Sequence, residues 1–385
     1  MKNNFLLLTL LLAAFEAITY LSTDMYLPAL PIIQTEFHLT HTQVQLTLTW
    51  WFIGASMLQL ILGPLADKWG RRPILFFGTI IFSVASFVCG YTDSYFLFTV
   101  CRFLQGCSVC TVLVSAYATI HELFDTKHAV KAVALMSAIT LLAPALGPLL
   151  GSLVMKFANW RVNFSGLAIS CLFVTIGLVF VMPETLKKPR SIKIGKTIKQ
   201  YIELAYVLGF LLPTLMVCLE FAGFISWITA SPLLLMTHFK LTQIEFSFCQ
   251  LIVFASFIVG TQFVKLLIDK KTLIQIVQVG VTTACIGALI CLISFFISAY
   301  YEILILGMIF YAIGSGLMSS ALNRLAMEVE GYPMGTKTAF YSFLISVFGV
   351  LGSLLINYFY LTWIVAVCGF SSLFLYYHYA SNKNL

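Results

Sequence analysis

Charge is what this sequence has least of. Only 10% of its 385 residues are Asp, Glu, Lys or Arg, whereas 60% are hydrophobic and the mean hydropathy is +0.98. So few charged side chains cannot cover a fold that is surrounded by water, and the composition therefore excludes an ordinary soluble globular domain. The sequence predicts a membrane protein.

The apolar residues fall into runs that are long enough to cross a bilayer. A helix needs about 20 apolar residues to span the hydrocarbon core, whereas a strand of a membrane β-barrel would alternate over about ten. We therefore expect an all-α membrane protein, with the first run retained as a helix because it has no small-residue cleavage pattern. Hydropathy predicts twelve transmembrane helices, at residues 5–32, 44–64, 74–91, 95–120, 131–155, 161–183, 205–236, 246–267, 273–298, 301–323, 336–356 and 358–379.

Lys and Arg are distributed unevenly between the predicted loops. Eighteen of the 22 lie in loops on the side of the N-terminus, and three, Lys156, Arg161 and Lys240, lie on the other side. The positive-inside rule then predicts that both termini are cytoplasmic. The net charge of +7 reflects this bias, and because the basic residues are spread over many loops we exclude nucleic-acid binding. The basic stretch 187–199 is a topology anchor or contacts anionic lipid headgroups.

The ten cysteines lie almost wholly within the apolar runs. Cys107 and Cys110 have the CxxC spacing of redox and zinc sites, but no second pair or His cluster accompanies them. We interpret them as small packing residues, and predict no metal site and no cofactor. The sequence shows no nucleophile–base pair either, so we do not expect an enzyme.

An internal repeat divides the chain. The stretch TEFHLT at 35–40 matches THFKLT at 237–242 in four of six positions, at an offset of 202 residues. Each stretch ends in the spacing of a helix capping box, Thr followed by Gln or Glu three residues later. Two six-helix bundles of the same orientation are implied, as in transporters with parallel repeats. We expect an N-terminal bundle at 1–183, a cytoplasmic linker at 184–204 and a C-terminal bundle at 205–385.

Four ionisable residues lie deep inside predicted helices: Glu16, Asp24, Arg102 and Glu220. A charge at the centre of a membrane helix costs about 3 kcal/mol on insertion scales, so such residues usually face a cavity or a partner. At a rise of 1.5 Å per residue, Asp24 lies level with Arg102, and Glu16 lies near the midplane, level with Glu220. Two pairings are therefore possible, Asp24 with Arg102 and Glu16 with Glu220, and they differ in chemistry.

Asp24 beside Arg102 would stay ionised until something separates the two groups, which makes a switchable ion pair, or alternatively a static pair that fixes packing. Glu16 near the midplane is the better candidate for a proton carrier, since a carboxylate in an apolar pocket or beside a second acid binds protons near neutral pH. For Glu220 the alternative is a hydrogen bond to a neighbouring helix with no transport role.

Other side chains are candidates for a substrate cavity. Tyr20 and Thr23 follow Glu16 at helical spacing and form a narrow polar stripe with Asp24. That stripe is expected to face the cavity. Phe15 and Trp227 line the same cavity or serve only as packing residues.

Three further stretches have distinctive patterns. The first, GPLADKWGRRP at 63–73, predicts a tight cytoplasmic turn in which Gly70 permits the chain reversal and Asp67 accepts hydrogen bonds. The second is RFLQG at 102–106. In the third, APALGPLLG at 143–151, small residues and prolines let helices approach closely and bend. The residues concerned in the first and third stretches are Gly63, Asp67, Gly70, Arg71 and Arg72, and Pro144, Gly147, Pro148 and Gly151.

These stretches resemble motifs A, B and C of the major facilitator superfamily, in that order. Together with STDMYLPALP at 22–31 and Glu16, the set is most similar to the MdfA-like multidrug/proton antiporters, close to the Bcr/CflA group. The resemblance implies that Glu16 and Asp24 bind protons and cationic substrate, with Arg102 as their electrostatic partner. It also implies that Asp67 and a neighbouring Arg lock a cytoplasmic gate. Glu220 lies outside the pattern of this group.

We therefore expect an exporter of the bacterial inner membrane that exchanges protons for lipophilic cationic or neutral compounds by alternating access. The proton gradient is its energy source, and its partners are the small-molecule substrate, protons and the lipid bilayer. We expect a monomer. The alternatives are a dedicated exporter of one metabolite, such as a siderophore or amino acid, and a membrane receptor that transports nothing.

Overall fold

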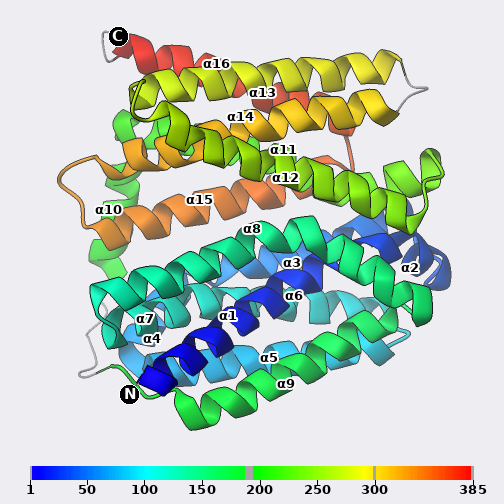
Figure 1. Cartoon of the computed structure of the whole chain (residues 1–385), viewed down its shortest axis with the longest axis vertical. Helices are drawn as coiled ribbons and strands as arrows, with labels where there is room; N and C mark the ends of the chain where they lie inside the picture. The colour runs from blue at the N-terminus through cyan, green and yellow to red at the C-terminus, as the bar shows by residue number, and fades with distance from the viewer. Residues whose placement is uncertain (1, 187–193, 298–300, 383–385) are drawn as a thin grey trace. The chain divides into compact units, whose positions relative to one another are not determined.

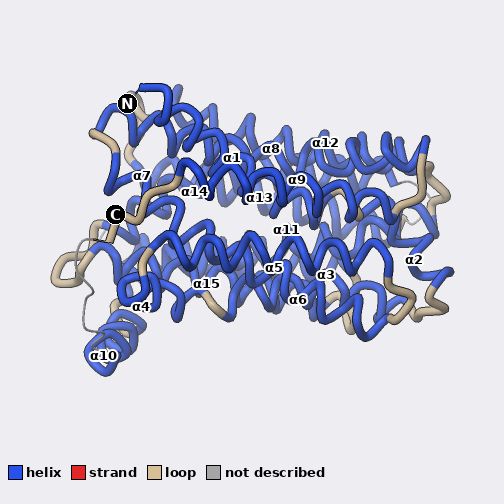
Figure 2. Tube along the Cα trace, turned by 90° about the horizontal axis from the view of Figure 1, so that it is seen from below, coloured by secondary structure: helices blue, strands red, loops and turns tan. Residues whose placement is uncertain are grey.

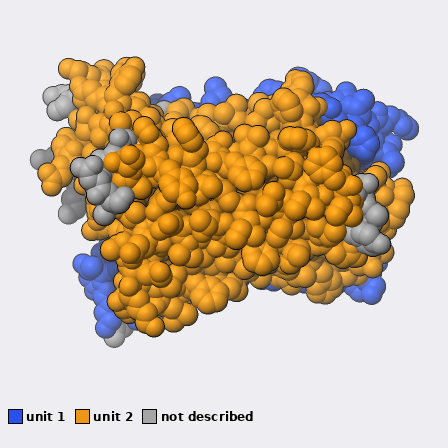
Figure 3. All heavy atoms as spheres, turned by 90° about the horizontal axis from the view of Figure 1, so that it is seen from above, with its two compact units in different colours: residues 1–192 blue, residues 193–385 orange. Residues whose placement is uncertain are grey.

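The computed structural model describes residues 2–186, 194–297 and 301–382. Within these ranges the regular structure is entirely helical, and eleven helices are long and apolar enough to cross a membrane (Figure 2). The chain divides into two compact units, residues 1–192 and 193–385, which Figure 3 distinguishes by colour. The predicted all-α membrane class is confirmed.

Unit 1 is built around α1, which packs against α8 and α9, while α6 packs between α3 and α5. Figure 1 labels these helices. Its elements are α1 (Lys2–Asp24), the 3₁₀-helix η1 (Leu27–Ala29), α2 (Leu30–Glu36), α3 (His41–Met57), α4 (Gln59–Trp69), α5 (Arg71–Tyr91), α6 (Tyr95–Thr111), the π-helix η2 (Val112–Ala116), α7 (Tyr117–Leu123), α8 (Thr126–Phe157) and α9 (Arg161–Val181).

Unit 2 is built around α11, which packs against α14, α15 and α16. The expected linker contains a helix, α10, which packs on α11 and α15. The elements of unit 2 are α10 (Ile194–Ala205), α11 (Leu208–Leu233), the π-helix η3 (Leu234–His238), α12 (Gln243–Leu267), α13 (Leu273–Phe296), α14 (Tyr301–Met327), α15 (Met334–Leu355) and α16 (Leu361–Asn382).

Two of the predicted spans are interrupted. The segment expected at 5–32 leaves the α-helix at Asp24 and resumes as α2. Pro28 and Pro31 are the second residues of the two short helices η1 and α2. Proline lacks the N–H that continues a helix but fits its first turn, which explains both restarts. The segment expected at 44–64 consists of α3 and α4, separated at Leu58, and is not among the eleven long helices.

The repeated loops have the same local geometry. His38 and Lys240, which occupy equivalent positions, both adopt left-handed backbone, with φ of 52° and 61°. Both predicted capping boxes are present, with Thr40 and Thr242 each accepting a hydrogen bond from the backbone three residues later. The repeat in the sequence is therefore a repeat in structure at these helix starts.

The turn that resembles motif A is tied to the segment after α9. Gly70 has φ of 105°, which L side chains rarely adopt, and a Cβ atom there would lie 2.3 Å from Glu184 Oε2. Because that space is empty, the Glu184 carboxylate accepts hydrogen bonds from the backbone N–H groups of Arg71 (3.0 Å) and Arg72 (3.1 Å) at the start of α5. Gly63 lies within α4.

Arg71 joins this turn to α7. Its Nη2 atom lies 2.7 Å from Asp67 Oδ1, the acceptor that the sequence suggested, and 3.0 Å from Glu122 Oε1. The other oxygen of Glu122 accepts a hydrogen bond from Thr185 Oγ1. Sequence reasoning missed Glu122 and treated Glu184 only as the start of the linker, because their partners are far away along the chain.

We expect Glu184→Gln to destabilise the protein by about 1 kcal/mol at pH 7, the usual effect of losing a helix N-terminal cap. Partial burial alone would raise the pKa of Glu184, but hydrogen bonds from four backbone N–H groups outweigh it and hold the pKa below its ordinary value of 4.5. A depressed pKa contributes stability above pH 4.5, and that contribution is lost as the pH falls through the folded-state value. The difference between parent and variant should therefore shrink in acid.

The measurement is the midpoint of thermal unfolding in detergent, compared between pH 7 and pH values below 4.5. Glu203→Gln is the control, because Glu203 is exposed and its ion pair with Lys199 is a surface pair of 3.8 Å. A Glu184→Gln effect that is equal at both pH values would rule out the charge as its cause.

Candidate functional site

Glu16 is a fully buried carboxylate in the middle of α1. Its Oε1 atom accepts hydrogen bonds from Tyr117 Oη of α7 (3.1 Å) and Thr140 Oγ1 of α8 (3.0 Å). Its Oε2 atom has no hydrogen-bond partner in the described part of the chain. An ionised carboxylate in such a place is poorly compensated, whereas a proton on Oε2 removes the charge. The geometry suits a group that gains and loses a proton.

Arg102 is buried in α6 and faces the C-terminal end of α1. Its Nη1 atom donates to Ser22 O (2.9 Å) and to Gln105 Oε1 (2.7 Å), and its guanidinium lies 4.3 Å from the centre of the Tyr26 ring. Its Nε and Nη2 atoms have no hydrogen-bond partner among the described residues. Arg102 is therefore held in place with part of its donor set unused.

Asp24, also buried, lies two residues beyond the carbonyl that Arg102 binds. Arg102 interacts with it electrostatically, but no ion pair of 4.0 Å or less joins them within the described ranges. Asp24 and Arg102 thus lie at the same level along their helices, as helix geometry predicted, but in the described structure they do not form an ion pair. A static buried ion pair is not what it contains.

The stretch that resembles motif C lies directly against Asp24. A Cβ atom on Gly147 would lie 2.4 Å from Asp24 Cβ, and one on Gly151 would lie 1.8 Å from Met25 O. Both distances are shorter than real side-chain contacts, so only glycine lets α8 pack this closely on the end of α1. Two prolines, the half-buried Pro144 and the buried Pro148, lie inside the same stretch of α8.

The other residues of α1 that the sequence singled out divide into polar and packing positions. Tyr20 is half-buried and interacts electrostatically with Glu16, and Thr23 is buried. Phe15 is fully buried and packs edge-on against Phe82, with ring centres 6.3 Å apart. The structure favours packing for Phe15.

Two predicted residues lie in unit 2. Glu220 of α11 is buried, and its Oε2 atom accepts a hydrogen bond from Ser315 Oγ of α14 at 2.7 Å. Trp227 is fully buried, and its indole N–H donates to Gln250 Oε1 at 2.8 Å, which favours the packing interpretation. The suggested pairing of Glu16 with Glu220 joins the two units and stays a prediction.

The tyrosine and threonine partners of Glu16 were not anticipated from the sequence. Tyr117 and Thr140 lie more than 100 residues away along the chain. A weak signal existed, because a buried acid requires hydroxyl or amide donors and these two lie in neighbouring predicted spans. Polar residues are too frequent in those spans for the signal to identify the pair.

Comparisons with known proteins find relatives that are named as drug transporters or drug-resistance proteins. The chain is 30% identical over 336 residues to the multidrug transporter MdfA of Yersinia pestis (87% of this chain, 82% of that one) and 31% identical over 345 residues to the chloramphenicol resistance protein CraA of Acinetobacter baumannii (88% and 83%). It is 29% identical over 332 residues to the multidrug resistance protein MdtM of Escherichia coli K12 (85% and 80%).

Solved structures share the fold. A D-xylose–proton symporter superposes with a TM-score of 0.75 at 16% identity, over 96% of this chain and 97% of that one. The family model described as Major Facilitator Superfamily matches residues 12–353. This multi-pass membrane protein belongs to the major facilitator superfamily.

Proposed function

We propose that the chain is a proton-coupled exporter of lipophilic cationic or neutral compounds in the bacterial inner membrane. Its relatives named as multidrug transporters and as a chloramphenicol resistance protein support this substrate class. The proton gradient supplies the energy, no cofactor takes part, and the working unit is a monomer.

The proposed topology has twelve spans with both termini in the cytoplasm. The α3–α4 pair supplies the twelfth span, since its 17 and 11 residues run almost continuously from His41 to Trp69. The excess of Lys and Arg on the N-terminal side supports the orientation. In this orientation the Arg71–Asp67 pair and Glu184 lie at the cytoplasmic end of unit 1, where a gate is expected.

One observation carries the proposal: a single helix, α1, holds two buried acids that are only partly compensated. Among the described residues, Glu16 keeps one oxygen without a hydrogen-bond donor, and Asp24 interacts with Arg102 without forming an ion pair. A proton or a cationic substrate neutralises either acid, but the two cannot be bound to one carboxylate together. This mutual exclusion couples inward movement of protons to outward movement of substrate as the site alternates between the two sides.

We expect Glu16→Gln and Asp24→Asn each to reduce substrate-induced proton release at least tenfold. Each substitution removes a carboxyl group whose proton the substrate must displace in order to bind. The measurement is the pH change of a weakly buffered detergent solution of purified protein on adding substrate. Asp93→Asn is the control, because that carboxylate is 90% exposed.

The same variants are scored for efflux in cells that lack other exporters, with and without a proton uncoupler. Correct membrane insertion is checked by the yield and thermal midpoint of each purified variant. Proton release that matches the parent in both acid variants would refute the coupling role of the α1 acids.

We expect Gly147→Ala to impair transport because it displaces Asp24. The added methyl overlaps Asp24 Cβ, so α8 and α1 must separate, and overpacking of this kind typically costs about 1–3 kcal/mol. The matched control is Gly166→Ala in α9, where a Cβ atom meets nothing within 4 Å. There the substitution should be neutral or stabilising by up to about 1 kcal/mol. Thermal midpoint and proton release are measured for both, and equal behaviour of the two variants would contradict the steric role of Gly147.

A further inference from the structure

We propose that α10 lies flat on the membrane surface at the end of unit 2 where α11 begins. Ile198, Ile202 and Tyr206 insert among the lipids, and Lys199 lies beside the headgroups of anionic phospholipids. The occupant of this surface is the bilayer itself. The leaflet that α10 meets, the cytoplasmic one, rests on the proposed topology, whereas its contact with lipid rests on α11 being a membrane span.

The helix α10 runs crosswise to the spans that it contacts. Figure 1 shows it running across the neighbouring helices of unit 2, and Figure 2 shows it end-on while α11 and α15 are seen along their length. Tyr201 of α10 stacks on Phe340 near the start of α15, with ring centres 5.4 Å apart, and Phe340 stacks on Phe210 near the start of α11 at 6.0 Å. Because α11 spans the bilayer, a helix that crosses its first turn lies parallel to the membrane plane.

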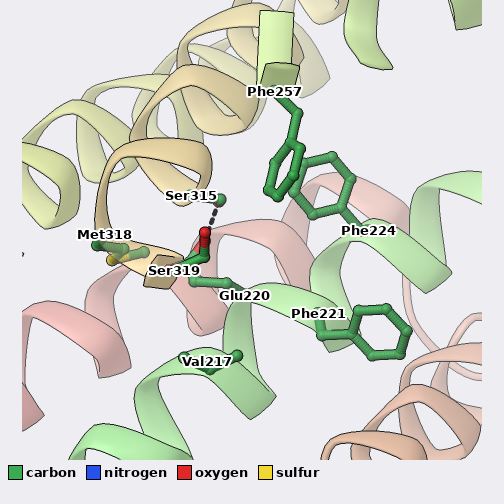
Figure 4. A pocket seen from close by; sticks show the side chains of 8 residues that line it. All are labelled: Val217, Glu220, Phe221, Phe224, Phe257, Ser315, Met318 and Ser319. Carbon is green, nitrogen blue, oxygen red and sulfur yellow. Dashed lines mark hydrogen bonds between the residues drawn. The ribbon is translucent and has the colours of Figure 1, made fainter. Parts of the chain in front are cut away.

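One face of α10 packs on the protein. Leu204 is fully buried in a cluster with residues of three other helices, Phe210, Ala326 and Tyr341. Val217 of α11 packs against this cluster and also lines the cavity beside Glu220 that Figure 4 shows. The core under α10 therefore continues along α11 into unit 2, and it fixes which side of α10 faces outwards.

The adjacent face of α10 is apolar and exposed. Ile198 and Ile202 are 51% and 57% exposed, and Tyr206, directly after the helix, is 82% exposed. These residues are four apart, so they lie on one side of the chain. Leu208, the first residue of the span α11, is 51% exposed as well. The exposed apolar residues therefore lead directly from α10 into a membrane span.

The polar side of α10 carries positive charge. Lys199 is 78% exposed, and its contact with Glu203 at 3.8 Å is a weak surface pair. The stretch 187–199 contains six Lys or Arg and no Asp or Glu. Helices that combine an apolar face with Lys or Arg lie in the membrane interface, where anionic headgroups attract the charge. Tyr206 at the end of the apolar stripe is also typical of that interface.

A topology anchor alone explains only half of these features. Positive charge is sufficient to keep a loop in the cytoplasm, and exposed Ile side chains add nothing to it. An acidic cytoplasmic protein would suit the charge, but it would have to cover Ile202 beside the residue at which α11 enters the bilayer. The lipid surface is already present there and matches both the charge and the apolar stripe.

The test places a nitroxide spin label on each of two adjacent residues of the full chain, through Ile202→Cys and Glu203→Cys. The purified variants are reconstituted into nanodiscs of three parts phosphatidylcholine to one part phosphatidylglycerol, so that lipid is the sole occupant on offer. Power-saturation EPR compares collisions of the label with oxygen, which concentrates in lipid, and with a water-soluble nickel chelate. We expect the oxygen-to-nickel ratio at residue 202 to be at least fivefold above that at residue 203.

The parent chain, whose ten cysteines are buried, is taken through the same labelling as the blank. The thermal midpoint of each variant checks that it is folded. Equal ratios at the two positions, with both labels accessible to the nickel chelate, would overturn the proposal and leave the apolar stripe to a protein partner.

The contribution of charge is measured with the label at residue 202. Nanodiscs of phosphatidylcholine alone, or about 1 M salt, should lower the oxygen-to-nickel ratio about twofold, because each removes the electrostatic attraction. Lys199→Glu should lower it in the mixed nanodiscs, whereas Lys271→Glu, which changes an exposed cation in the turn between α12 and α13, should not. A ratio that is the same in both lipid mixtures would refute the binding of anionic headgroups.

Failure of this inference is distinguishable from failure of the proposed function, because the labelling experiment needs neither substrate nor a proton gradient. A high ratio at residue 202 combined with unchanged proton release in Glu16→Gln and Asp24→Asn would leave the lipid contact standing and the proposed coupling wrong. Loss of proton release combined with equal ratios at residues 202 and 203 would have the opposite meaning.

Discussion

The interior of a membrane-spanning helix bundle offers no bulk water to solvate a charge, and this constraint governs the arrangement of the protein. Each ionisable group inside a span must be paired, neutralised or given a site that a ligand completes. Arg102 is the best compensated of the four, through a backbone carbonyl, an amide and an aromatic ring. In the described part of the chain, Glu16 and Glu220 each accept hydrogen bonds from hydroxyl groups on one carboxylate oxygen and none on the other. Incomplete compensation at fixed positions is what leaves room for a proton or a cation.

Close packing decides where those groups lie. Gly147 and Gly151 bring the backbone of α8 against Asp24 and Met25, so the last turn of α1 is fixed by contact rather than by a salt bridge. Asp24 is therefore positioned independently of its charge partner. An acid held in this way can exchange partners without moving its helix, which a group located by its own ion pair cannot do.

Local patterns predicted local structure well. Hydropathy located the eleven long helices among its twelve predicted spans, and capping-box spacing identified the starts of α3 and α12 from Thr40 and Thr242. Counting residues also brought Asp24 and Arg102 to one level. It could not give the direction of the Arg102 side chain, which turns to Ser22 and Gln105, because rotamer choice depends on every neighbouring helix.

Partners distant in the chain could not be found in this way. Glu184 lies 113 residues from Arg71, and no periodicity connects a loop after one helix with the first turn of another. The same holds for Tyr117 and Thr140 around Glu16. A single sequence shows which groups need partners, but tertiary packing selects among many candidates of the same chemistry.

Glu16 and Glu220 also show why a constant residue offset is an incomplete guide to a structural repeat. The offset of 202 that relates the loops places Cys218, not Glu220, opposite Glu16. Between each acid and its loop, however, lies an irregular turn, the 3₁₀-helix η1 in unit 1 and the π-helix η3 in unit 2. A 3₁₀-helix has fewer than 3.6 residues per turn and a π-helix has more. An equal number of residues therefore does not place side chains on the same helix face in the two units.

Contacts are the better criterion of equivalence. Glu16 binds a hydroxyl on Tyr95–Leu123 through Tyr117. This is the third long span of unit 1, and the fourth once the interrupted α3–α4 pair is counted. Glu220 binds a hydroxyl on the fourth long helix of unit 2 described after the linker, α14, through Ser315. Each half therefore places one acid of its first helix against a hydroxyl of its fourth, and the two halves present the same chemistry from positions that do not align in the sequence.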